Sequence, residues 1–325
     1  MIKSWTLKTR TIRFERTVLM GILNATPDSF SDGGRFAKKS DRFDVDLDAL
    51  VDAGRKLVRD GAGILDVGGE STRPGSDPVD EAEELRRVVP AIRALKAALD
   101  VPISVDTYRP AVADAALESG ADIVNDVAAG RYIGSQKRFA QEDEEDFPEE
   151  TAEVAKRRGA AVVLMHMRGV PKTMQERTPE YPNGVVNEVC AFLARRRDRF
   201  LEQGVPIEKI AFDPGLGFGK TFEQNWELLK NVDKLHELGG VLLVGDSRKR
   251  FLAETARRFN ESREAPPDDD VDPDAIRTRD FATVATTVAL ARKGVQIARV
   301  HNVALSAFAL DLARRSGELA TWRDL

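Results

Sequence analysis

Polar side chains stand at the ends of short apolar runs along this sequence, and several are of types that recognise a small polar molecule. Eight runs rich in Val, Ile and Leu each carry a hydrogen-bonding residue at or close to their end: Asn24, Asp66, Asp106, Asn125, His166, Asp213, Ser247 and His301. Asp106, Asn125 and Asp213 suit a flat, nitrogen-rich heterocycle, because carboxylates accept hydrogen bonds from ring N–H and amino groups, and an amide both donates and accepts. One polar strand end is routine in a turn, but eight in succession predict a polar cavity.

A second group of side chains suits an anion. Arg73, Arg299 and His301 are cations of the kind that bind a phosphate or diphosphate, and Asn24 offers an oxygen to a Mg²⁺ ion carried by that anion. The segment "SRKR", residues 247–250, follows an apolar run and opens a predicted helix. The free N–H groups of a helix start already carry positive potential, so cations placed there favour a bound anion over a merely solvated surface.

The elements that must position these residues are short strands alternating with amphipathic helices. The predicted strands are 17–23, 62–68, 101–106, 121–126, 160–166, 209–213, 240–245 and 296–301. The predicted helices are 46–62, 81–99, 109–121, 152–160, 185–204, 222–239, 280–294 and 304–315. Each strand is apolar without alternation, which is typical of parallel strands covered on both faces. Eight pairs predict a single-domain α/β fold, a (β/α)₈ TIM barrel over residues 1–325.

A doubly wound open sheet is the alternative to the barrel. It has no support as a dinucleotide-binding fold, because no G-x-G-x-x-G opens a helix after the first predicted strand. The barrel makes the sharper prediction that all eight polar strand ends lie on one face.

Composition limits the possible partners. The formal net charge of −5, from 49 Lys and Arg against 54 Asp and Glu, gives no basic surface for nucleic acid or acidic lipid. The single cysteine, Cys190, allows no internal disulfide. No stretch has the character of a signal peptide or a membrane span. These features predict a cytoplasmic protein with small-molecule substrates and no nucleic-acid or membrane partner.

Other catalytic chemistries lack their signatures. Neither G-x-S-x-G nor H-E-x-x-H is present, and no cysteine joins His166 and His301 at a zinc-like spacing. Cys190 lies in a helical pattern, which favours a packed side chain over a nucleophile.

Two acidic stretches, 135–150 and 260–275, stand between predicted elements as insertions. Their composition predicts solvated, disordered loops, since charge-rich segments with few apolar residues bury little surface. Binding of a partner is a second possibility for them.

Eight segments together resemble dihydropteroate synthase, in order and at matching spacing. They are "MGILNATPDSFSDGG", "ILDVGGESTRPGS", "SVDTYRP", "NDV", "LMHMRGVPKTMQ", "DPGLGFGKTFEQNWELL", "VGDSRKRF" and "RVHNV". The resemblance runs from about Val18 to the last predicted helix, and its first two segments are highly specific.

The resemblance implies a reaction in folate synthesis in which p-aminobenzoate displaces diphosphate from 6-hydroxymethyl-7,8-dihydropterin diphosphate, with Mg²⁺ as cofactor. It implies sulfonamides as inhibitors. It assigns the pterin to Asp106, Asn125, Asp213 and Lys249, and the diphosphate to Asn24, Arg73, Arg299 and His301, with Asn24 also near the metal. It assigns p-aminobenzoate to Phe30, Thr72, Pro74, Phe218, Ser247 and Arg250. The residues expected to carry catalysis are Arg73, Lys249, Arg299, His301 and Asn24.

The resemblance also implies a dissociative mechanism, in which the bond to diphosphate breaks first and leaves a pterin cation. The segments "DSFSDGG" and "STRPGS" are then closing loops that keep water from the cation, with Phe30 walling the p-aminobenzoate site and Arg73 reaching the diphosphate. Homodimers through the late helices are usual in the family, and residues 281–294 have the small apolar face for such an interface.

This sequence departs from the family pattern at three positions. Asn302 stands where Asp is usual, Ala253 where Gly is common, and Ala25 where Val is usual. None of the three removes a residue with an assigned role. Residues 135–150 and 260–275 are additions to the pattern.

Three other functions are alternatives for this sequence. A pterin-dependent methyltransferase shares the Asp and Asn pterin pocket, but it needs neither the "STRPGS" loop nor the "SRK" cluster. A catalytically silent pterin-binding paralogue is expected to lose loop residues first, whereas Asn24, Phe30 and Arg73 are all present. A phosphate-binding lyase or aldolase barrel needs a lone Schiff-base lysine at a strand end, and Lys249 stands among arginines.

Overall fold

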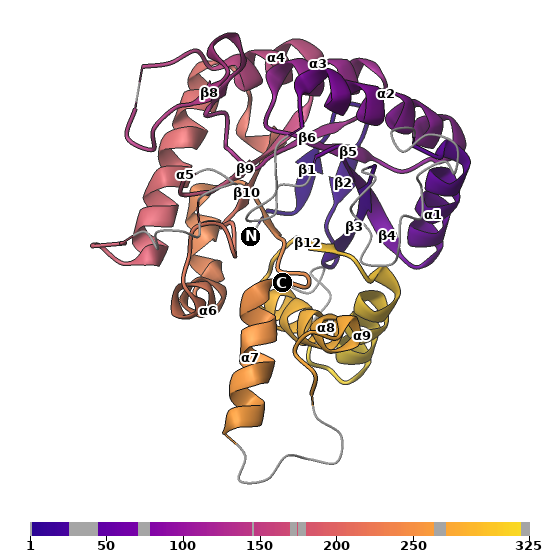
Figure 1. Ribbon diagram of the computed structural model, residues 1–325, viewed down its shortest axis with the longest axis vertical. Helices are drawn as coiled ribbons and strands as arrows, with labels where there is room; N and C mark the ends of the chain where they lie inside the picture. Colours follow the sequence, from indigo (N-terminus) through magenta and orange to yellow (C-terminus); the bar gives the residue numbers. More distant parts are fainter. Residues whose placement is uncertain are drawn as a thin grey trace.

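Eight parallel strands close into a barrel surrounded by helices (Figure 1). The computed structural model describes residues 2–25, 45–70, 79–144, 146–169, 174, 180–262 and 271–319. The barrel strands are β3 (Val18–Asn24), β4 (Ala62–Gly68), β5 (Ile103–Asp106), β6 (Ile123–Asp126), β9 (Ala161–Met165), β10 (Ile210–Asp213), β11 (Val241–Val244) and β12 (Ile297–Val300). Around the barrel the order is β10-β11-β12-β3-β4-β5-β6-β9. The predicted TIM barrel is therefore confirmed, and the doubly wound open sheet is excluded.

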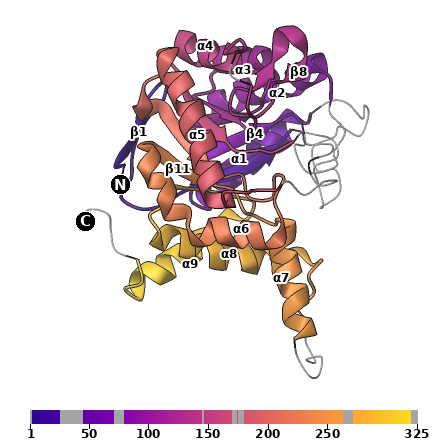
Figure 2. The same cartoon turned by 90° about the vertical axis from the view of Figure 1, so that its left-hand side faces the viewer.

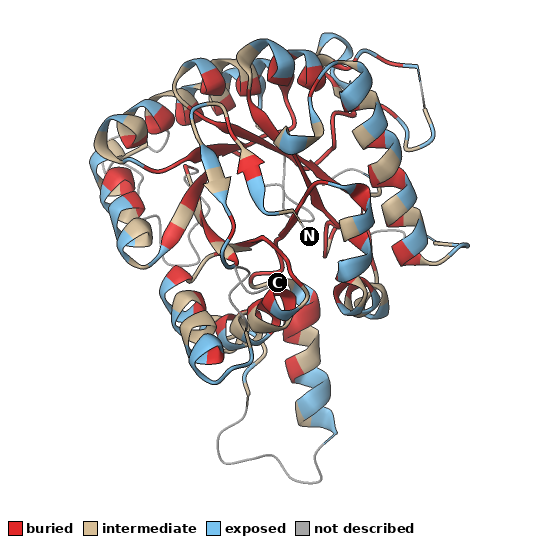
Figure 3. Ribbon diagram, turned by 180° about the vertical axis from the view of Figure 1, so that it is seen from behind, coloured by how far each residue is buried: buried red, intermediate tan, exposed pale blue. Residues whose placement is uncertain are grey.

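Consecutive residues of each strand pack into two separate apolar cores. Met20, Ile64 and Val163 belong to a core inside the barrel, whereas their neighbours Leu19 and Leu65 pack in the layer between strands and helices. This alternation follows from the period of two along a strand. Both cores exclude water, so the strands read as continuous apolar runs, and most of their residues are buried (Figure 3).

A short hairpin that the sequence analysis did not predict precedes the barrel. β1 (Ser4–Thr6) pairs antiparallel with β2 (Thr11–Arg13). The hairpin region carries Trp5, Leu7 and Phe14, which are buried in the same cluster as the inward-facing strand residues. These side chains close the amino-terminal end of the barrel with apolar surface.

The helices surround the barrel and lie close to the predicted ranges: α1 (Leu47–Arg59), α2 (Glu81–Ala98), α3 (Pro110–Glu118), α4 (Glu150–Arg158), α5 (Val185–Glu202), α6 (Phe222–Lys230), α7 (Arg250–Glu261), α8 (Ile276–Arg292) and α9 (Val303–Arg315). The predicted helix 222–239 is divided. A 3₁₀ helix, Val232–Leu238, follows α6 because buried side chains at Leu229, Val232, Leu235 and Leu238 recur every three residues, the period of that helix.

Two helices, α7 and α8, lie between β11 and β12, where the predicted ranges contained one. Helix α7 begins directly after the "SRK" residues and projects from the barrel (Figure 2). It is amphipathic, with Phe251, Leu252 and Ala256 buried. Ala253, at the position where glycine was expected, is buried in the first turns of this helix.

The acidic segment 135–150 is mostly exposed, but parts of it are ordered and anchored. Residues Gly134–Gln136 form a 3₁₀ turn, and β8 (Arg138–Phe139) pairs with β7 (Tyr132–Ile133). Phe147 is buried, and the buried Glu149 accepts from Arg196 Nη1 at 2.9 Å. Aromatic side chains and a buried ion pair thus anchor a segment whose average composition is highly charged.

The second acidic segment, 260–275, is only partly described. Helix α7 includes its first residues and ends at Glu261, and residues 271–275 lead into α8. Residues 263–270 lie outside the described part of the chain. Among the helices that are described, none combines the length and apolar character needed to cross a membrane.

Candidate active site

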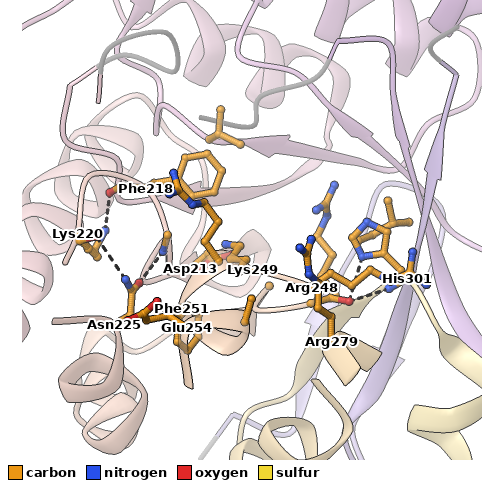
Figure 4. Close-up of a pocket in the computed structure, with 18 of the residues that line it drawn as sticks. Asp213, Phe218, Lys220, Asn225, Arg248, Lys249, Phe251, Glu254, Arg279 and His301 are labelled. Atoms are coloured by element: carbon orange, nitrogen blue, oxygen red, sulfur yellow. Dashed lines mark hydrogen bonds between the residues drawn. The ribbon is translucent and has the colours of Figure 1, made fainter. Parts of the chain in front are cut away.

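The carboxyl ends of the barrel strands surround a cavity of 810 Å³. Ten of the residues predicted to form the site line this one cavity: Asn24, Asp106, Asn125, Asp213, Phe218, Ser247, Lys249, Arg250, Arg299 and His301. Several of them are drawn in Figure 4. The other four predicted residues, Phe30, Thr72, Arg73 and Pro74, lie outside the described residues. The barrel geometry thus brings together side chains from strands that are far apart in sequence.

Arg299 joins two carboxylates at the floor of the cavity. Its Nε donates to Asp66 Oδ2 at 2.6 Å, and its Nη2 donates to Asp106 Oδ2 at 2.7 Å. Asn125 Nδ2 also donates to Asp66 Oδ2, at 3.1 Å. The residue predicted to bind an anion is therefore held between carboxylates on the heterocycle side, and the two halves of the predicted site share it.

Of the two floor carboxylates, Asp106 lines the cavity and keeps hydrogen-bonding capacity for a ligand. Oδ1 of Asp66 and Oδ1 of Asp106 are buried and have no hydrogen-bond partner among the described residues. Burial raises the pKa of Asp106, the charge of Arg299 opposes that rise, and Asp66 adds to it. An unpartnered buried carboxylate oxygen is costly, so a ligand N–H that donates to it is bound with corresponding strength.

Asp213 and Lys249 stand on another side of the cavity (Figure 4). Asp213 Oδ1 accepts from the Gly215 amide at 2.7 Å, and burial raises the pKa of this carboxyl against the charge of Lys249. Lys249 Nζ donates to the Leu216 carbonyl and lies 4.7 Å from the centre of the Phe218 ring. Burial lowers the pKa of Lys249 to about 8, partly offset by Asp213. A bound anion would therefore favour the protonated form of Lys249 and raise its pKa.

His301 and Ser247 form a pair at the ends of two neighbouring strands. The Ser247 hydroxyl lies 3.0 Å from His301 Nδ1 and accepts from the His301 amide at 3.2 Å. This contact joins the turn after β11 to the end of β12.

The cations of the "SRKR" segment have separate surroundings. Arg248, whose φ is +59°, ion-pairs with Asp280 of α8 at 2.7 Å. Lys249 lines the cavity, and Arg250 is the exposed first residue of α7 that also borders the cavity. Arg248 therefore differs from Lys249 and Arg250, because its charge is paired with Asp280.

Asp280 also explains Asn302. Asn302 Nδ2 donates to Asp280 Oδ2 at 2.9 Å, and its Oδ1 accepts from the Leu305 amide at the start of α9. An aspartate here keeps the helix cap but places a second carboxylate against Asp280. The amide suits a position that must both donate and accept.

A magnesium ion is implied by the family resemblance, and the oxygen ligands here fit one. Within the described residues, no group of three or more His, Cys, Asp or Glu could hold a metal by itself. Asn24 lines the cavity, and its Oδ1 stands near Gly68 at the end of β4. Mg²⁺ usually keeps several waters and binds through few protein oxygens together with substrate phosphates, so one amide oxygen at this place is compatible with it.

Two of the eight polar strand ends do not line the cavity. Asp66 lies behind the lining residues, and His166 is completely buried beside Lys220, which the sequence analysis did not single out. Lys220 follows the glycine-rich turn "PGLGFG". Its burial could not be predicted from the sequence, because a lysine after such a turn is usually exposed. The role of Asp66 as a partner of Arg299 was not predicted, although a charged residue inside the apolar run 62–68 is a sign of a buried ion pair.

Comparison with known proteins places the chain in a family. The family model described as "Pterin binding enzyme" matches residues 20–301. Dihydropteroate synthase of Synechocystis sp. is 40% identical over 289 residues, covering 89% of this chain and 86% of the relative. A Yersinia pestis dihydropteroate synthase structure, in complex with a sulfonamide drug, superposes with a TM-score of 0.79 at 34% identity, covering 97% of this chain and 99% of the other.

A Xanthomonas albilineans dihydropteroate synthase structure with 4-aminobenzoic acid superposes with a TM-score of 0.77 at 35% identity, covering 98% of this chain and 100% of the other. These similarities extend over the whole barrel and agree with the segments noted in the sequence. The chain therefore belongs to the dihydropteroate synthase family of pterin-binding enzymes, which are transferases of folate biosynthesis.

Proposed function

We propose that the cavity joins p-aminobenzoate to 6-hydroxymethyl-7,8-dihydropterin diphosphate, giving 7,8-dihydropteroate and diphosphate. The observation that carries this proposal is the floor of the cavity. There, Arg299 bridges the buried carboxylates of Asp66 and Asp106, and Asp106 lines the cavity with one oxygen that has no partner among the described residues. Asn125, Asp213 and Lys249 line the same cavity. This set of acceptors suits the N–H and amino groups of a pterin.

The pterin is placed on Asp106, Asn125, Asp213 and Lys249. Asp106 and Asp213 accept hydrogen bonds from its ring N–H and amino groups, and Asn125 both donates and accepts. Lys249 donates to ring acceptors once it leaves the Leu216 carbonyl. The carboxylates also stabilise the positive charge that develops on the pterin as the bond to diphosphate breaks.

The leaving diphosphate is placed against Arg299, His301 and Asn24, which line the cavity, and the family resemblance assigns Arg73 to it as well. The bond between the exocyclic carbon and the diphosphate oxygen breaks, and the electron pair leaves with the diphosphate. Cationic groups fixed at that position stabilise the departing anion more strongly than water does. A bound Mg²⁺, held in part by the Asn24 oxygen, supplies further neutralisation of diphosphate charge.

The p-aminobenzoate is placed beside Phe218, Ser247 and Arg250, with Phe30, Thr72 and Pro74 completing its site. Phe218 packs on the aromatic ring, and Arg250 faces the carboxylate. The amine nitrogen attacks the carbon cation, forms the C–N bond and releases a proton to water. A strong general base is not required, since the electrophile is fully formed before the attack.

The exposed apolar side chains of α8 and α9 support a homodimer. Phe281, Phe308 and Leu312 are 56%, 66% and 56% exposed, and Leu305 lies beside them. Monomeric proteins rarely expose so many large apolar side chains on one pair of helices. We place the reaction in the cytoplasm, for which a single unpaired, half-buried cysteine, Cys190, is suitable.

The experiment supplies purified protein with dihydropterin diphosphate, Mg²⁺ and p-aminobenzoate and measures both products. We expect release of diphosphate together with dihydropteroate. Lys249→Ala and Arg73→Ala are expected to lower kcat/KM by about 100-fold or more, because each removes a charge next to the reacting groups. Lys234→Ala, at an exposed lysine of the 3₁₀ helix after α6, serves as the control. Binding of pterin without turnover would contradict the proposal and indicate the silent paralogue.

A further inference from the structure

Lys220 is a buried charged residue that the proposed chemistry does not use. Lys220 is 4% exposed and directly follows the turn 214–219 after β10. Its Nζ donates to the Phe218 carbonyl at 3.0 Å (Figure 4) and to the Gly215 carbonyl at 2.8 Å, and it lies 2.9 Å from His166 Nδ1. A longer contact of 3.4 Å reaches the His166 carbonyl, so four acceptors surround this amino group.

The turn that Lys220 holds packs closely on the end of β9. Gly215 and Gly219 have φ values of +66° and +65°, and a Cβ atom at Gly215 would lie 1.9 Å from the His166 carbonyl oxygen. Only glycine fits there. Backbone carbonyls of this turn point inward, away from water, and the Lys220 ammonium supplies the hydrogen bonds that they need.

The same turn sets the wall of the cavity. Phe218 lies 4.7 Å below the Lys249 ammonium, and the Leu216 carbonyl accepts from that ammonium. A shift of the turn therefore moves the Phe218 ring, whereas the backbone of Lys249 is held separately at the start of α7. Asn225 holds the other side of the turn, where its Oδ1 accepts from the Gly217 amide at 2.6 Å.

Two further residues connect Lys220 to the acidic segment 135–150. His166 Nε2 lies 3.7 Å from Glu142 Oε1, and Arg168 holds Glu142 through Nε at 2.7 Å and Nη2 at 2.6 Å. Burial and the Lys220 charge lower the pKa of His166 to about 3, so the imidazole is neutral. Its Nδ1 therefore accepts from Lys220, and its Nε2–H faces the Glu142 carboxylate.

The charged groups near Lys220 have opposing effects on its pKa. Burial, together with the charges of Lys249 and Arg168, lowers the pKa of Lys220 well below its usual value, and Asp213 and Glu142 oppose this shift. Glu142 is the carboxylate on the side away from the substrate cavity, so it supports the charge of Lys220 without contacting the proposed substrates.

We propose that Lys220 is a positioning residue for the p-aminobenzoate site, which holds the Phe218 wall through the Gly215 and Phe218 carbonyls and is supported by Glu142 through His166. This inference rests on the proposed function, because it assigns Phe218 to p-aminobenzoate. It gives the acidic segment a role: one of its carboxylates fixes the charge that shapes the active-site turn.

The test uses steady-state kinetics with each substrate varied in turn. Lys220→Met keeps the length of the side chain but removes the donor. We expect the KM for p-aminobenzoate to rise about ten-fold and the KM for dihydropterin diphosphate to change by less than about three-fold, because the pterin contacts on the strands are retained. Glu142→Gln is expected to give a smaller rise of the same kind. Glu144→Gln is the matched control, since Glu144 is in the same segment but pairs with the exposed Arg138.

A second readout does not depend on turnover. The Phe218 amide donates to the Gly215 carbonyl at 3.1 Å, so its hydrogen exchange reports how firmly the turn is held. We expect faster exchange of the 215–219 amides in Lys220→Met and Glu142→Gln, and wild-type exchange in Glu144→Gln. If Lys220→Met does not fold, Glu142→Gln decides.

Unchanged exchange, or equal changes in both KM values, would overturn the positioning role. Absence of turnover in the wild-type protein is a different result. It contradicts the proposed function and with it the assignment of Phe218 to p-aminobenzoate, and the exchange data then decide whether Lys220 orders the turn.

Discussion

The two ends of the barrel carry opposite kinds of side chain, apolar at the amino-terminal end and charged at the carboxyl end. At the amino-terminal end, Trp5, Leu7 and Phe14 complete an apolar core that continues inside the strands. At the carboxyl end, Asp106 and Arg299 stand in a cavity of 810 Å³. One end buries apolar surface and stabilises the fold. The other keeps charged groups whose hydrogen bonding is incomplete, which lowers stability but leaves those groups available to a ligand.

The comparison teaches that stability and activity depend on separate residues of one barrel. Substitutions at the amino-terminal end are expected to change the free energy of unfolding and leave kinetics intact. Substitutions at the carboxyl end are expected to do the reverse or to affect both in opposite directions. The predictions below test this separation, from the largest expected effect to the smallest.

Arg299→Met is expected to have the largest effect. It leaves Asp66 and Asp106 without their shared cation and removes a charge next to the leaving group. We expect kcat/KM to fall by about three orders of magnitude, because preorganised charge is among the largest contributions to catalysis. Steady-state kinetics measure the change, and Arg55→Met, at an exposed arginine of α1, is the control. A loss of less than ten-fold in Arg299→Met would show that the floor is not the catalytic centre.

Trp5→Ala tests the other end of the barrel. Trp5 is fully buried, so we expect the free energy of unfolding to fall by about 3–5 kcal/mol, with kcat/KM unchanged below the unfolding transition. Chemical denaturation measures the loss. Trp5→Phe is the milder partner, since Trp5 Nε1 has no hydrogen-bond partner among the described residues and its removal leaves no acceptor unpaired. A kinetic defect in folded Trp5→Ala would break the separation.

The pH dependence of Lys249 moves activity and stability in opposite directions. Burial lowers its pKa to about 8, from 10.5 in an unfolded chain. We expect kcat/KM to fall as the pH rises through 8, where the ammonium loses its proton. Between about 8 and 10.5 the unfolded chain binds more protons than the folded state, so the contribution of Lys249 to the free energy of unfolding rises with pH.

Lys249→Arg is the variant that checks this assignment, because a guanidinium stays charged throughout the range. The alkaline limb of the rate profile near pH 8 is expected to disappear, and the rise in the unfolding free energy above pH 8 is expected to disappear with it. An unchanged alkaline limb in Lys249→Arg would assign the titration to another group.

Asn302→Asp is expected to have the smallest effect. It keeps the cap on α9 but places a carboxylate against Asp280. We expect the free energy of unfolding to fall by about 1 kcal/mol and kcat/KM to stay within about two-fold. Adding Asp280→Asn removes the carboxylate repulsion but also the ion pair with Arg248, so the double variant is expected to recover only part of the loss. Equal stability of Asn302→Asp and wild type would remove the explanation given for Asn302.

Much of this site could be predicted from sequence because the barrel imposes a simple rule. Parallel strands deliver their carboxyl ends to one face, so Asn24, Asp106 and Asp213 could be grouped without knowing any distance. The rule does not say which polar end points into the cavity and which lies behind it. His166 was misjudged for that reason, because it lies one residue beyond β9 and is covered by the turn after β10.

Residues that act through tertiary contacts could not be found in the sequence. Lys220 becomes notable only when the Gly215 and Phe218 carbonyls turn inward. Glu142 becomes notable only when its segment folds back to within 3.7 Å of His166. Composition describes the average of a segment, whereas one buried carboxylate and a few aromatic side chains decide its structure.

The most direct test of the central claim is the stoichiometry of the two products of the wild-type protein. With dihydropterin diphosphate, Mg²⁺ and p-aminobenzoate, one diphosphate is expected for each dihydropteroate, and omission of p-aminobenzoate is expected to leave only slow diphosphate release, as water captures the pterin cation. Tight pterin binding with neither product formed would contradict the account, because the carboxylate floor would then bind the heterocycle without activating it.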